Sequence, residues 1–479
     1  MTDIAKNRIS GMRGFPALLL FLFLSLAAVT SCISDSFTTS PSDLLSFSSD
    51  TVTFDTVFTG QGTPTARLKV YNRAKKAINI SDIRFRNPQS GFSVNVDGVS
   101  GKDFQNVEIR GGDSIFIFIE CFIPESSSSR PYLVEDQLLF FTNGVEQKVQ
   151  VEAYGQNVRR LRAMRVSEDM TLTSDMPYVV FDSLVVERGA TLRIEPGADI
   201  LFHDKASLAV YGTLEAVGAP GHLINMRGDR LDNVLPGVGY DILAGQWKGI
   251  RIHKDSYGNR MEYVDMRSTV QGLVADSCGD ISRSKLLLVN SWLHNSQSNV
   301  LKSVDARIDA YGCVFSEAAA AVVSLAGGLH EFTQCTFSNN YLFSAITEPL
   351  LCLYHIREEP GAIGDGARPY MSAHFRNSIF YGLPSDINAG DLDGTDVYLS
   401  YCSLKSAGSD DEHFVSCLWD TDPLFLTRRA DYYFNYEVEA GSPVIGAGDP
   451  TFVTGLCVTD INGVDRLEHG NPTLGAYAR

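Results

Sequence analysis

The sequence predicts an all-β chain in two parts, an antiparallel β-sandwich followed by a parallel β-helix. Two observations carry this prediction. Six short segments within residues 263–404 repeat one pattern, and their first residues lie 27, 22, 22, 43 and 24 positions apart. Upstream, residues 49–157 contain alternating apolar stretches separated by turn residues, at the spacing of a sandwich. Residues 160–430 show no apolar stripe of helical period and length, so the second part is also expected to be β-structure.

The first 31 residues have the features of an export signal. A basic start is followed by the apolar run 15–29, which is too short for a comfortable membrane span. The run ends in Val29-Thr-Ser-Cys32, which resembles a bacterial lipobox; an ordinary secretory signal that happens to contain Cys32 is the alternative. The resemblance implies lipidation of Cys32 and a membrane anchor. The Ser/Thr-rich residues 32–48 are then expected to form a flexible tether.

Residues 49–157 are predicted to form an immunoglobulin-like sandwich of seven or eight strands. Turn pairs such as Asp97-Gly98 and Asn143-Gly144 separate the apolar stretches. The expected strands are 53–58, 66–71, 78–85, 92–96, 107–109, 115–122, 137–141 and 147–154. The runs 54–58 (FDTVF) and 68–72 (LKVYN) resemble the β-sandwich modules that follow the tether in Bacteroidetes lipoproteins. No catalytic constellation is visible here, so a spacer or docking role is expected.

The repeated segments predict a solenoid. They are 263–266 (YVDM), 290–293 (NSWL), 312–315 (GCVF), 334–337 (QCTF), 377–380 (NSIF) and 401–404 (YCSL). The second residue of each is compact and the fourth is large and apolar, and residues two apart on a strand share a face. A strand that returns about every 22 residues with the same face inward is typical of coils stacked on one another.

The 43-residue interval between Gln334 and Asn377 admits two interpretations. The pieces 341–349 and 357–369 do not repeat, and they are interpreted as loops inserted into a single coil, since loops tolerate insertion at little cost. Two complete coils with weak repeats would give the same spacing. The sequence leaves this open.

Further motifs resemble right-handed parallel β-helix proteins. They are 189–197 (GATLRIEPG), 210–218 (VYGTLEAVG), 245–250 (GQWKGI), 441–449 (GSPVIGAGD), 460–466 (DINGVDR) and 474–477 (LGAY). The resemblance implies a right-handed β-helix over residues 165–435 and a closing segment over 436–479. The sandwich is expected to shield the first coil and the C-terminus the last, since open strand edges need a cover. The whole arrangement resembles uncharacterised Bacteroidetes surface lipoproteins.

Eight cysteines follow Cys32, and those in the stacked coils are expected to remain reduced. Cys313, Cys335 and Cys402 occupy the same position of the repeat as Ser and Val, so they should behave as small buried apolar residues. Cys313 and Cys335 would lie one rung apart, near enough for a bridge that the packing does not require. No closely spaced Cys/His cluster is present, so the sequence predicts no metal site and no cofactor.

Catalysis is not expected. A polygalacturonase-like Gly-His-Gly is absent, because Gly221-His222 continues with Leu223. Asp410-Asp411 lies in a Ser/Gly-rich loop and is interpreted as a solvated turn. Residues 391–396 (DLDGTD) have the acids of a calcium loop without its later bidentate Glu, and are interpreted as an Asx-rich turn. The catalytic residues are therefore predicted to be none.

One long loop interrupts the coil pattern between Arg227 and Trp247 and holds the candidate binding residues. They are Asp229, Arg230, Asp232, Tyr240, Asp241 and Trp247. Binding residues commonly lie on loops held by a rigid scaffold, and this loop carries side chains of both charges and aromatic rings. The alternative is that the loop only folds over the coils, with Trp247 buried and the ion pairs satisfying one another.

Three functions remain open on the sequence. The first is a lipid-anchored outer-membrane protein whose β-helix is a non-catalytic binding or structural scaffold for a glycan or protein. The cell surface is the expected location, and the periplasmic face is the alternative. The second is a carbohydrate-active enzyme, a polysaccharide lyase or hydrolase. The third is an accessory subunit of an outer-membrane β-barrel complex. The formal charge of −17 argues against nucleic acid as a partner. A cleft with three or more acids within one or two coils would favour the enzyme, and a large exposed apolar patch on the sandwich would favour the accessory subunit.

Overall fold

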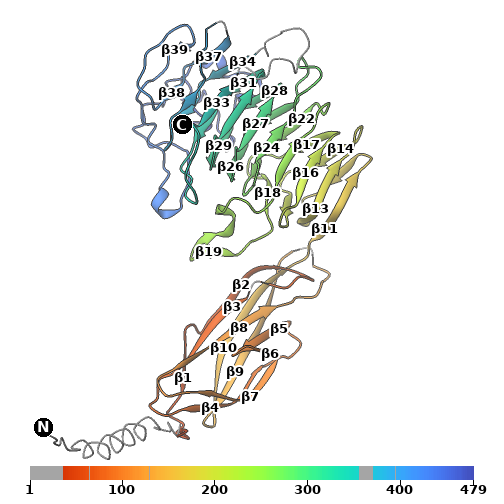
Figure 1. Ribbon diagram of the computed structural model, residues 1–479, viewed down its shortest axis with the longest axis vertical. Helices are drawn as coiled ribbons and strands as arrows, with labels where there is room; N and C mark the ends of the chain where they lie inside the picture. The colour runs from red at the N-terminus through yellow and green to blue at the C-terminus, as the bar shows by residue number, and fades with distance from the viewer. Residues whose placement is uncertain (1–35, 64, 129, 355–370, 394) are drawn as a thin grey trace, which may run out of the picture. The chain divides into compact units, whose positions relative to one another are not determined.

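The computed structural model describes residues 36–63, 65–128, 130–354, 371–393 and 395–479. The predicted signal peptide and Cys32 lie outside the described residues. The chain divides into two compact units, one containing Gln61–Ile123 and Leu133–Ala153 and the other containing Tyr154–Arg479 (Figure 1). Among the described residues, no helix has the length and apolar character that crossing a bilayer requires.

The first unit is built around two five-stranded antiparallel sheets. One sheet has the order β1 (Leu45–Phe47), β3 (Ala66–Asn72), β8 (Ser114–Cys121), β5 (Phe92–Val96) and β6 (Val99–Gly101). The other has the order β2 (Thr51–Phe58), β10 (Val145–Gln156), β9 (Tyr132–Thr142), β4 (Ile78–Phe85) and β7 (Asp103–Ile109). All eight strands expected from the sequence are present, and β1 and β6 are additional.

Aromatic residues from the two sheets meet in the interior of this unit. The rings of Phe85 and Phe92 lie 5.9 Å apart, and those of Phe47 and Phe140 lie 4.9 Å apart. Because β1 pairs with β3 and Leu45 is buried, the folded part begins before residue 49, within the segment expected to be a tether. The Ser/Thr-rich composition gave no indication that this segment contains the buried side chain of Leu45 and the edge strand β1.

The second unit is a stack of coils in which three parallel ladders run side by side. Ladder A contains β15 (Asp199–Phe202), β18 (Ile224–Gly228), β23 (Val264–Met266), β26 (Trp292–Ser296), β29 (Val314–Ala318), β32 (Thr336–Ser338), β35 (Ile379–Phe380) and β38 (Ser403–Leu404). Ladder B contains β16 (Ser207–Val210), β21 (Gly249–Ile252), β24 (Leu273–Ala275), β27 (Leu301–Val304), β30 (Val323–Ala326), β33 (Leu351–Tyr354) and β36 (Ile387–Asn388).

Ladder C completes each coil. It contains β12 (Met170–Leu172), β14 (Thr191–Ile194), β17 (Thr213–Val217), β22 (Asn259–Glu262), β25 (Leu286–Val289), β28 (Arg307–Tyr311), β31 (Gly328–Thr333), β34 (Met371–Arg376), β37 (Asp396–Ser400) and β39 (Phe414–Val415). The long strand β13 (Tyr178–Val186) pairs with β15 through its first half and with β16 through its second. It also pairs with β11 (Arg159–Val166), so the stack begins before residue 165. The all-β parallel architecture predicted for this part is confirmed.

The first residue of each repeated segment turns the chain from ladder C into ladder A. All six have positive φ, and they are Tyr263 (49°), Asn290 (44°), Gly312 (66°), Gln334 (57°), Asn377 (48°) and Tyr401 (53°). This left-handed conformation is readily adopted by Gly and Asn and costs about 1 kcal/mol or more for other residues. The following residue points inward at every corner, and Cys313, Cys335 and Cys402 are fully buried there as predicted.

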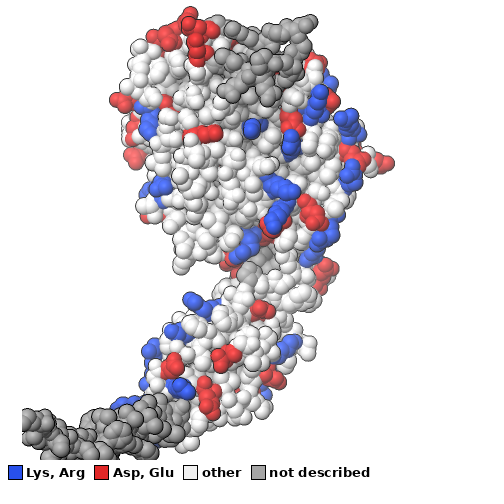
Figure 2. Space-filling view, viewed as in Figure 1, with Lys and Arg blue, Asp and Glu red and all other residues white. Residues whose placement is uncertain are grey.

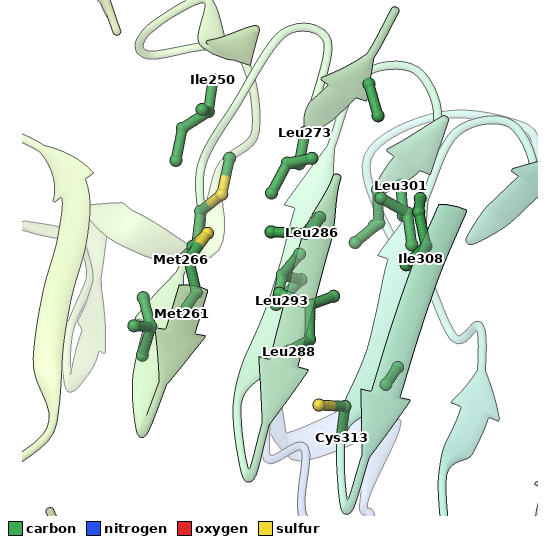
Figure 3. Close-up of a cluster of buried hydrophobic side chains, with 14 of the residues drawn as sticks. Ile250, Met261, Met266, Leu273, Leu286, Leu288, Leu293, Leu301, Ile308 and Cys313 are labelled. Atoms are coloured by element: carbon green, nitrogen blue, oxygen red, sulfur yellow. The ribbon is translucent and has the colours of Figure 1, made fainter. Parts of the chain in front are cut away.

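Large apolar side chains fill the interior in vertical rows. Leu273, Leu286 and Leu293 show the mixture of ladders that supplies them (Figure 3). Phe315 and Phe337 stack with ring centroids 5.4 Å apart, and Phe337 and Phe380 stack at 4.4 Å. The fourth residues of the repeats therefore lie above one another, which is what the repeat predicted.

The 43-residue interval is a single coil with insertions. Phe337 of β32 pairs directly with Phe380 of β35, and Val323 of β30 pairs with Leu351 of β33. No rung lies between these partners. The insertion 341–349 is placed between β32 and β33, and residues 357–369 lie outside the described residues.

The C-terminal segment lies along the side of the stack, not across its last coil as expected. Asn377 donates to the Asp449 carbonyl at 2.9 Å and accepts from its amide at 2.9 Å, and Asn290 donates to the Thr459 carbonyl at 3.2 Å. Corner residues of several coils thus hold one irregular strip. The strip satisfies amide groups that a regular β-helix leaves at its corners. We call residues 429–479 the C-terminal strip. Its short 3-10 turns are η3 (Arg429–Asp431), η4 (Pro450–Phe452) and η5 (Gly455–Cys457).

Each of the eight cysteines that the structure describes is a free thiol. Burial raises the pKa of Cys121 to about 12 and holds the pKa of Cys402 far above its usual range. Thiols in this state are inert packing groups, since the thiolate is the reactive form. This agrees with the prediction of reduced cysteines in the stack.

Candidate functional site

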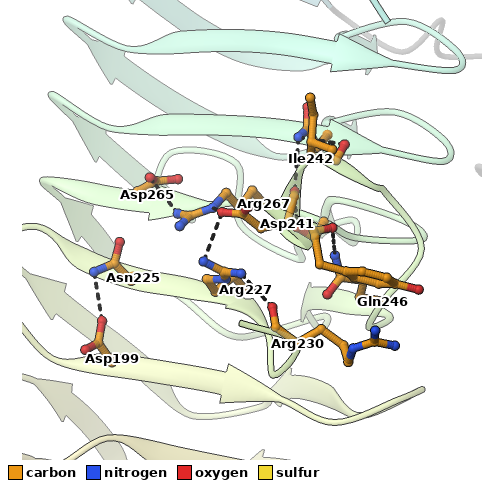
Figure 4. Close-up of polar contacts among 12 residues, drawn as sticks. Asp199, Asn225, Arg227, Arg230, Asp241, Ile242, Gln246, Asp265 and Arg267 are labelled. Atoms are coloured by element: carbon orange, nitrogen blue, oxygen red, sulfur yellow. Dashed lines mark hydrogen bonds and ion pairs between the residues drawn. The ribbon is translucent and has the colours of Figure 1, made fainter. Parts of the chain in front are cut away.

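The long loop predicted between Arg227 and Trp247 connects β18 of ladder A to β21 of ladder B. It contains the hairpin strands β19 (Asn233–Leu235) and β20 (Val238–Gly239) and the 3-10 turn η1 (Tyr240–Ile242). The next coils cross the same corner in a few residues, between β23 and β24 and between β26 and β27. The extra chain folds back onto ladder A (Figure 4).

Trp247 attaches the end of the loop to the interior of the stack. Its side chain is fully buried, and its ring stacks on Phe202 with centroids 3.9 Å apart. Its indole N–H donates to the Arg267 carbonyl at 2.7 Å. Since a buried indole needs a partner for its N–H, this bond fixes the ring and with it the loop.

Side chain to backbone hydrogen bonds hold the rest of the loop. Asn295 donates to the carbonyls of Asp241 and Ile242 at 3.2 and 3.1 Å, and Ser268 donates to the Asp241 carbonyl at 2.7 Å. Gln246 donates to the carbonyls of Tyr240 and Leu243 within the loop. The loop is therefore preorganised by the coils beneath it.

Five charged or titratable side chains form one network under the loop. Asp241 pairs with Arg227 at 3.0 Å and with Arg267 at 2.8 Å. Arg267 also pairs with Asp265 at 2.6 Å, and Asp265 contacts the Nε2 atom of His294 at 3.0 Å. Apart from Asp241, these residues stand on or next to neighbouring rungs of ladder A, as Figure 4 shows for Arg227, Asp265 and Arg267. The loop residue Asp241 is thus bound into charges that the coils supply.

The network keeps both carboxylates ionised. Burial acts to raise the pKa of Asp265, but Arg267 and His294 outweigh it and hold that pKa well below its usual range. Burial likewise acts on Asp241, whose pKa is nevertheless lowered by Arg227 and Arg267. At neutral pH the network therefore contains two negatively charged carboxylates, which are paired with the guanidinium groups of Arg227 and Arg267.

A cleft of about 450 Å³ opens beside this network. Acidic, basic and aromatic side chains line it together, among them Asp241, Asp265, Arg267, Trp292, His294, Asp431, Tyr432, Tyr433 and Phe434. Trp292 is half-buried and stacks on His294 with centroids 4.4 Å apart. Tyr433, which also lines the cleft, is 41% exposed. The volume lies within the range of small-ligand sites, about 300–1,000 Å³.

A second cavity of about 380 Å³ lies on the other side of the same loop. Asp229, Arg230 and Tyr240 line it, and the Arg230 guanidinium lies 3.9 Å from the centre of the Tyr240 ring. Asp232 pairs with Arg230 at 2.5 Å. Cation–π contact and the ion pair orient these groups in advance of any ligand.

The predicted binding residues are thus divided between three surroundings. Asp229, Arg230 and Tyr240 line the second cavity, and Asp241 lines the 450 Å³ cleft. Asp232 does not line the second cavity but pairs with Arg230. Trp247 lies in the core and positions the loop without reaching either space. The buried Trp247 and the mutual ion pairs agree with the alternative interpretation, in which the loop only folds over the coils. The two cavities are the feature that the binding interpretation requires.

The sequence interpretation missed Asp265, Arg267, Trp292 and His294. Asp265 and Trp292 are the third residues of their repeats, next to the inward second and fourth residues, so they point outward on adjacent rungs. A comparison of outward-facing positions in successive repeats would have shown them to be neighbours. Tyr433 gave no such signal, because it reaches the cleft from the C-terminal strip.

The cleft contains three aspartates, the number that was expected to favour an enzyme. Asp431 pairs with Arg428 at 3.1 Å on the exposed rim, and the other two are paired with Arg267. Glycoside hydrolysis requires one carboxyl whose pKa is raised so that it can donate a proton. Asp241 and Asp265 have the opposite shift, which suits them to accept hydrogen bonds.

Acidic and basic side chains are interspersed over the visible face of the molecule, and no broad basic patch interrupts them there (Figure 2).

The fold and this site define an all-β protein with a long parallel β-helix that carries a polar and aromatic cleft. No family model matches the chain, and no curated protein matches it. Alignments to solved structures are short. A protein of unknown function from Porphyromonas gingivalis W83 aligns with 14% identity over 23% of this chain and 46% of that chain, with a TM-score of 0.18. The Vibrio cholerae VesB protease aligns with 14% identity over 24% and 32%, with a TM-score of 0.18.

A family 123 glycoside hydrolase from Clostridium perfringens aligns with 8% identity over 25% of this chain and 30% of that chain, with a TM-score of 0.17. The chain spans less than half the length of each of these three proteins. At these TM-scores the alignments carry no argument about fold or function.

Proposed function

We propose that this chain is a lipid-anchored outer-membrane protein whose β-helix is a non-catalytic scaffold that binds a glycan. The 450 Å³ cleft is the observation that supports the proposal, because it combines half-exposed aromatic rings with ionised acids and the guanidinium group of Arg267. Sugars present apolar C–H faces that stack on such rings and hydroxyl groups that donate to carboxylates. A protein ligand is the alternative partner for the same cleft.

The state of the acids supports binding over cleavage. Asp241 and Asp265 are held by Arg267 in the absence of any ligand, so a bound sugar meets acceptors in a fixed position. Preorganised groups improve affinity because less motion is lost on binding. Neither carboxyl is poised to protonate a glycosidic oxygen. The carbohydrate-active enzyme is therefore the less favoured function.

The proposal predicts retention of one class of polysaccharide by the purified full-length chain on a glycan array. Replacing Tyr433 with Ala should weaken that binding at least tenfold, since aromatic residues that dominate a binding site commonly contribute about 2 kcal/mol or more. Tyr154→Ala, which removes a similarly exposed ring (44%) outside the cleft, is the matched control. Shortened or unsaturated sugar products during the incubation would instead favour the enzyme.

A blank array would contradict glycan binding. If the lipidated chain then co-purified with an outer-membrane protein, the accessory-subunit function would be favoured. One feature supports that second candidate: Phe116 and Phe118 stack with centroids 6.3 Å apart and are 40% and 38% exposed on β8. Arg67 and Lys69 flank them, so the apolar area is small.

The membrane anchor is proposed from the lipobox-like end of the N-terminal segment. In a bacterial host that processes lipoproteins, the chain is expected to incorporate a clickable fatty acid, and Cys32→Ser should lose the label completely. Cys278→Ser, at a partly exposed thiol of the β-helix unit, is the control that should keep it. Labelling that persists in Cys32→Ser would contradict lipidation at this residue.

Two finer features of the fold belong to the same proposal. We propose that the two antiparallel sheets form an immunoglobulin-like sandwich that acts as a spacer or docking module between anchor and β-helix. The ten strands in two five-stranded sheets and their shared aromatic core support it. The right-handed winding of the coils is proposed from the sequence resemblance and from the general handedness of parallel crossovers.

A further inference from the structure

Two loops that the sequence interprets as simple turns come together at the C-terminal end of ladder C. Asp393 precedes β37, and Glu412 and His413 precede β39. One carboxylate oxygen from each acid and one ring nitrogen of His413 all lie within 4.8 Å of one another. The three residues come from successive rungs of the stack, because β37 pairs with β39.

His413 supplies the observation that distinguishes this cluster from exposed acids. It is 7% exposed, and its Nδ1 atom lies 2.8 Å from the Val397 carbonyl, to which it donates. The donated proton leaves the lone pair on Nε2. Within the described residues that Nε2 atom is buried and has no hydrogen-bond partner. Its nearest carboxylate oxygen, on Glu412, lies 3.9 Å away.

We propose that Asp393, Glu412 and His413 bind one divalent first-row transition metal ion, with Zn²⁺ as the best fit. A histidine whose other nitrogen donates to a backbone carbonyl is the usual form of a metal-binding imidazole. Imidazole selects such ions over Ca²⁺ and Mg²⁺, and two carboxylates neutralise the charge of the ion. Water would fill the remaining coordination positions.

The geometry requires only small movements of mobile side chains. A tetrahedral ion with bonds of about 2.0–2.1 Å holds its ligand atoms about 3.3 Å apart. The carboxylates must therefore move inward by about 1.5 Å at most from the observed separation. Asp393 and Glu412 are exposed and free to rotate, whereas His413 is held in place.

The bound ion would tie the last rungs of ladder C together. Among the described residues, β37 and β39 are the last two strands of this ladder, and each of the two loops leads into one of them. An ion that bridges them stabilises the open end of the stack, because it binds the folded state alone. This site is separate from the cleft, and the inference does not depend on the proposed glycan.

The nearest thiol on the same stretch of chain does not compete for the ion. Burial raises the pKa of Cys417 to about 11, and its sulfur donates to the Leu399 carbonyl at 3.3 Å. Zinc binds the thiolate form, which is scarce at neutral pH under these conditions.

The test is calorimetric titration of metal-stripped, full-length protein with Zn²⁺ at neutral pH, with a phosphine reductant to keep the thiols reduced. One equivalent is expected to bind, and His413→Gln and Asp393→Asn should each weaken the affinity at least tenfold. Glu412→Gln, at a side chain that is 79% exposed and cannot disturb folding, should do the same. The urea midpoint of the wild-type chain should rise with Zn²⁺.

Glu468→Gln and His469→Gln are the matched controls, since they alter an adjacent acid–histidine pair that is exposed and outside the cluster. Both should bind Zn²⁺ as the wild type does. Unchanged affinity in Glu412→Gln and His413→Gln would overturn the proposal, as would tighter binding of Ca²⁺ than of Zn²⁺. Co²⁺ absorption in the visible region, absent in His413→Gln, gives an independent measure of nitrogen ligation.

Discussion

Replacing Phe337 with Ala is expected to lower the free energy of unfolding of the β-helix unit by about 3–5 kcal/mol. Phe337 is fully buried at the centre of the aromatic row, with Phe315 on one side and Phe380 on the other. Phe332 and Phe375 pack against it from ladder C at 5.7 and 5.9 Å. Truncation would remove contacts in three directions and leave a cavity that rigid strands cannot close.

Urea denaturation followed by tryptophan fluorescence measures this loss in the correct part of the chain. All three tryptophans, Trp247, Trp292 and Trp419, lie in the β-helix unit. Phe337→Leu should cost less, because it retains most of the apolar volume. Phe343→Ala, at a ring that is 42% exposed on the inserted loop, should change the free energy of unfolding by less than about 0.5 kcal/mol. A loss in Phe337→Ala no larger than this control would contradict the stacked interior.

Replacing Arg267 with Met is expected to cost about 3–5 kcal/mol at pH 7. Its side chain is 13% exposed and lies between the carboxylates of Asp241 and Asp265. Removing the guanidinium leaves two half-buried negative charges with fewer partners, and their desolvation is no longer offset. Adding Asp265→Asn to Arg267→Met should restore part of the loss, since it removes one of the stranded charges.

The pH dependence follows from the lowered pKa values of Asp241 and Asp265. In the wild type their contribution to stability is fully present above the unfolded pKa of about 3.9 and is lost as the pH falls through the lower folded values. Without Arg267 both folded pKa values rise. The deficit of the variant should therefore be largest at pH 7 and should shrink as the pH approaches about 4, where protonation removes the unpaired charge.

Arg428→Met, which removes the ion-pair partner of the cleft residue Asp431, provides the control. Arg428 and Asp431 form an ion pair at 3.1 Å, but their side chains are 63% and 65% exposed. Exposed pairs contribute about 0–1 kcal/mol, because water screens them. An Arg267→Met deficit that matches this control, or that does not change with pH, would contradict the buried network.

The strands of the β-helix could be predicted closely from the sequence. The repeated segments 263–266, 312–315 and 334–337 lead directly into β23, β29 and β32. Alternation on a strand is a local property, and the repeat shows which face is inward. The additional edge strands β1 and β6 were missed because each is only three residues long and carries few buried side chains.

The cleft could be predicted only in part. The loop from Arg227 to Trp247 was recognisable because it interrupts a regular pattern. Its partners Asp265 and Trp292 required the outward register of the coils, and Tyr433 required the path of the C-terminal strip. That path depends on corner amides such as Asn377 finding backbone partners about 70 residues away, which no local pattern encodes.

The sequence by itself determined that this chain coils, which residues fill its interior, and where a loop leaves the coil, because each of these follows from side chains that repeat at a fixed spacing. Only the tertiary structure decided which polar groups meet. Asp393 looked like part of a turn, and neither His413 nor Asp265 stood out in the sequence. Stacking placed them beside their partners, since the rung spacing of about 4.8 Å brings side chains 20 or more residues apart into contact.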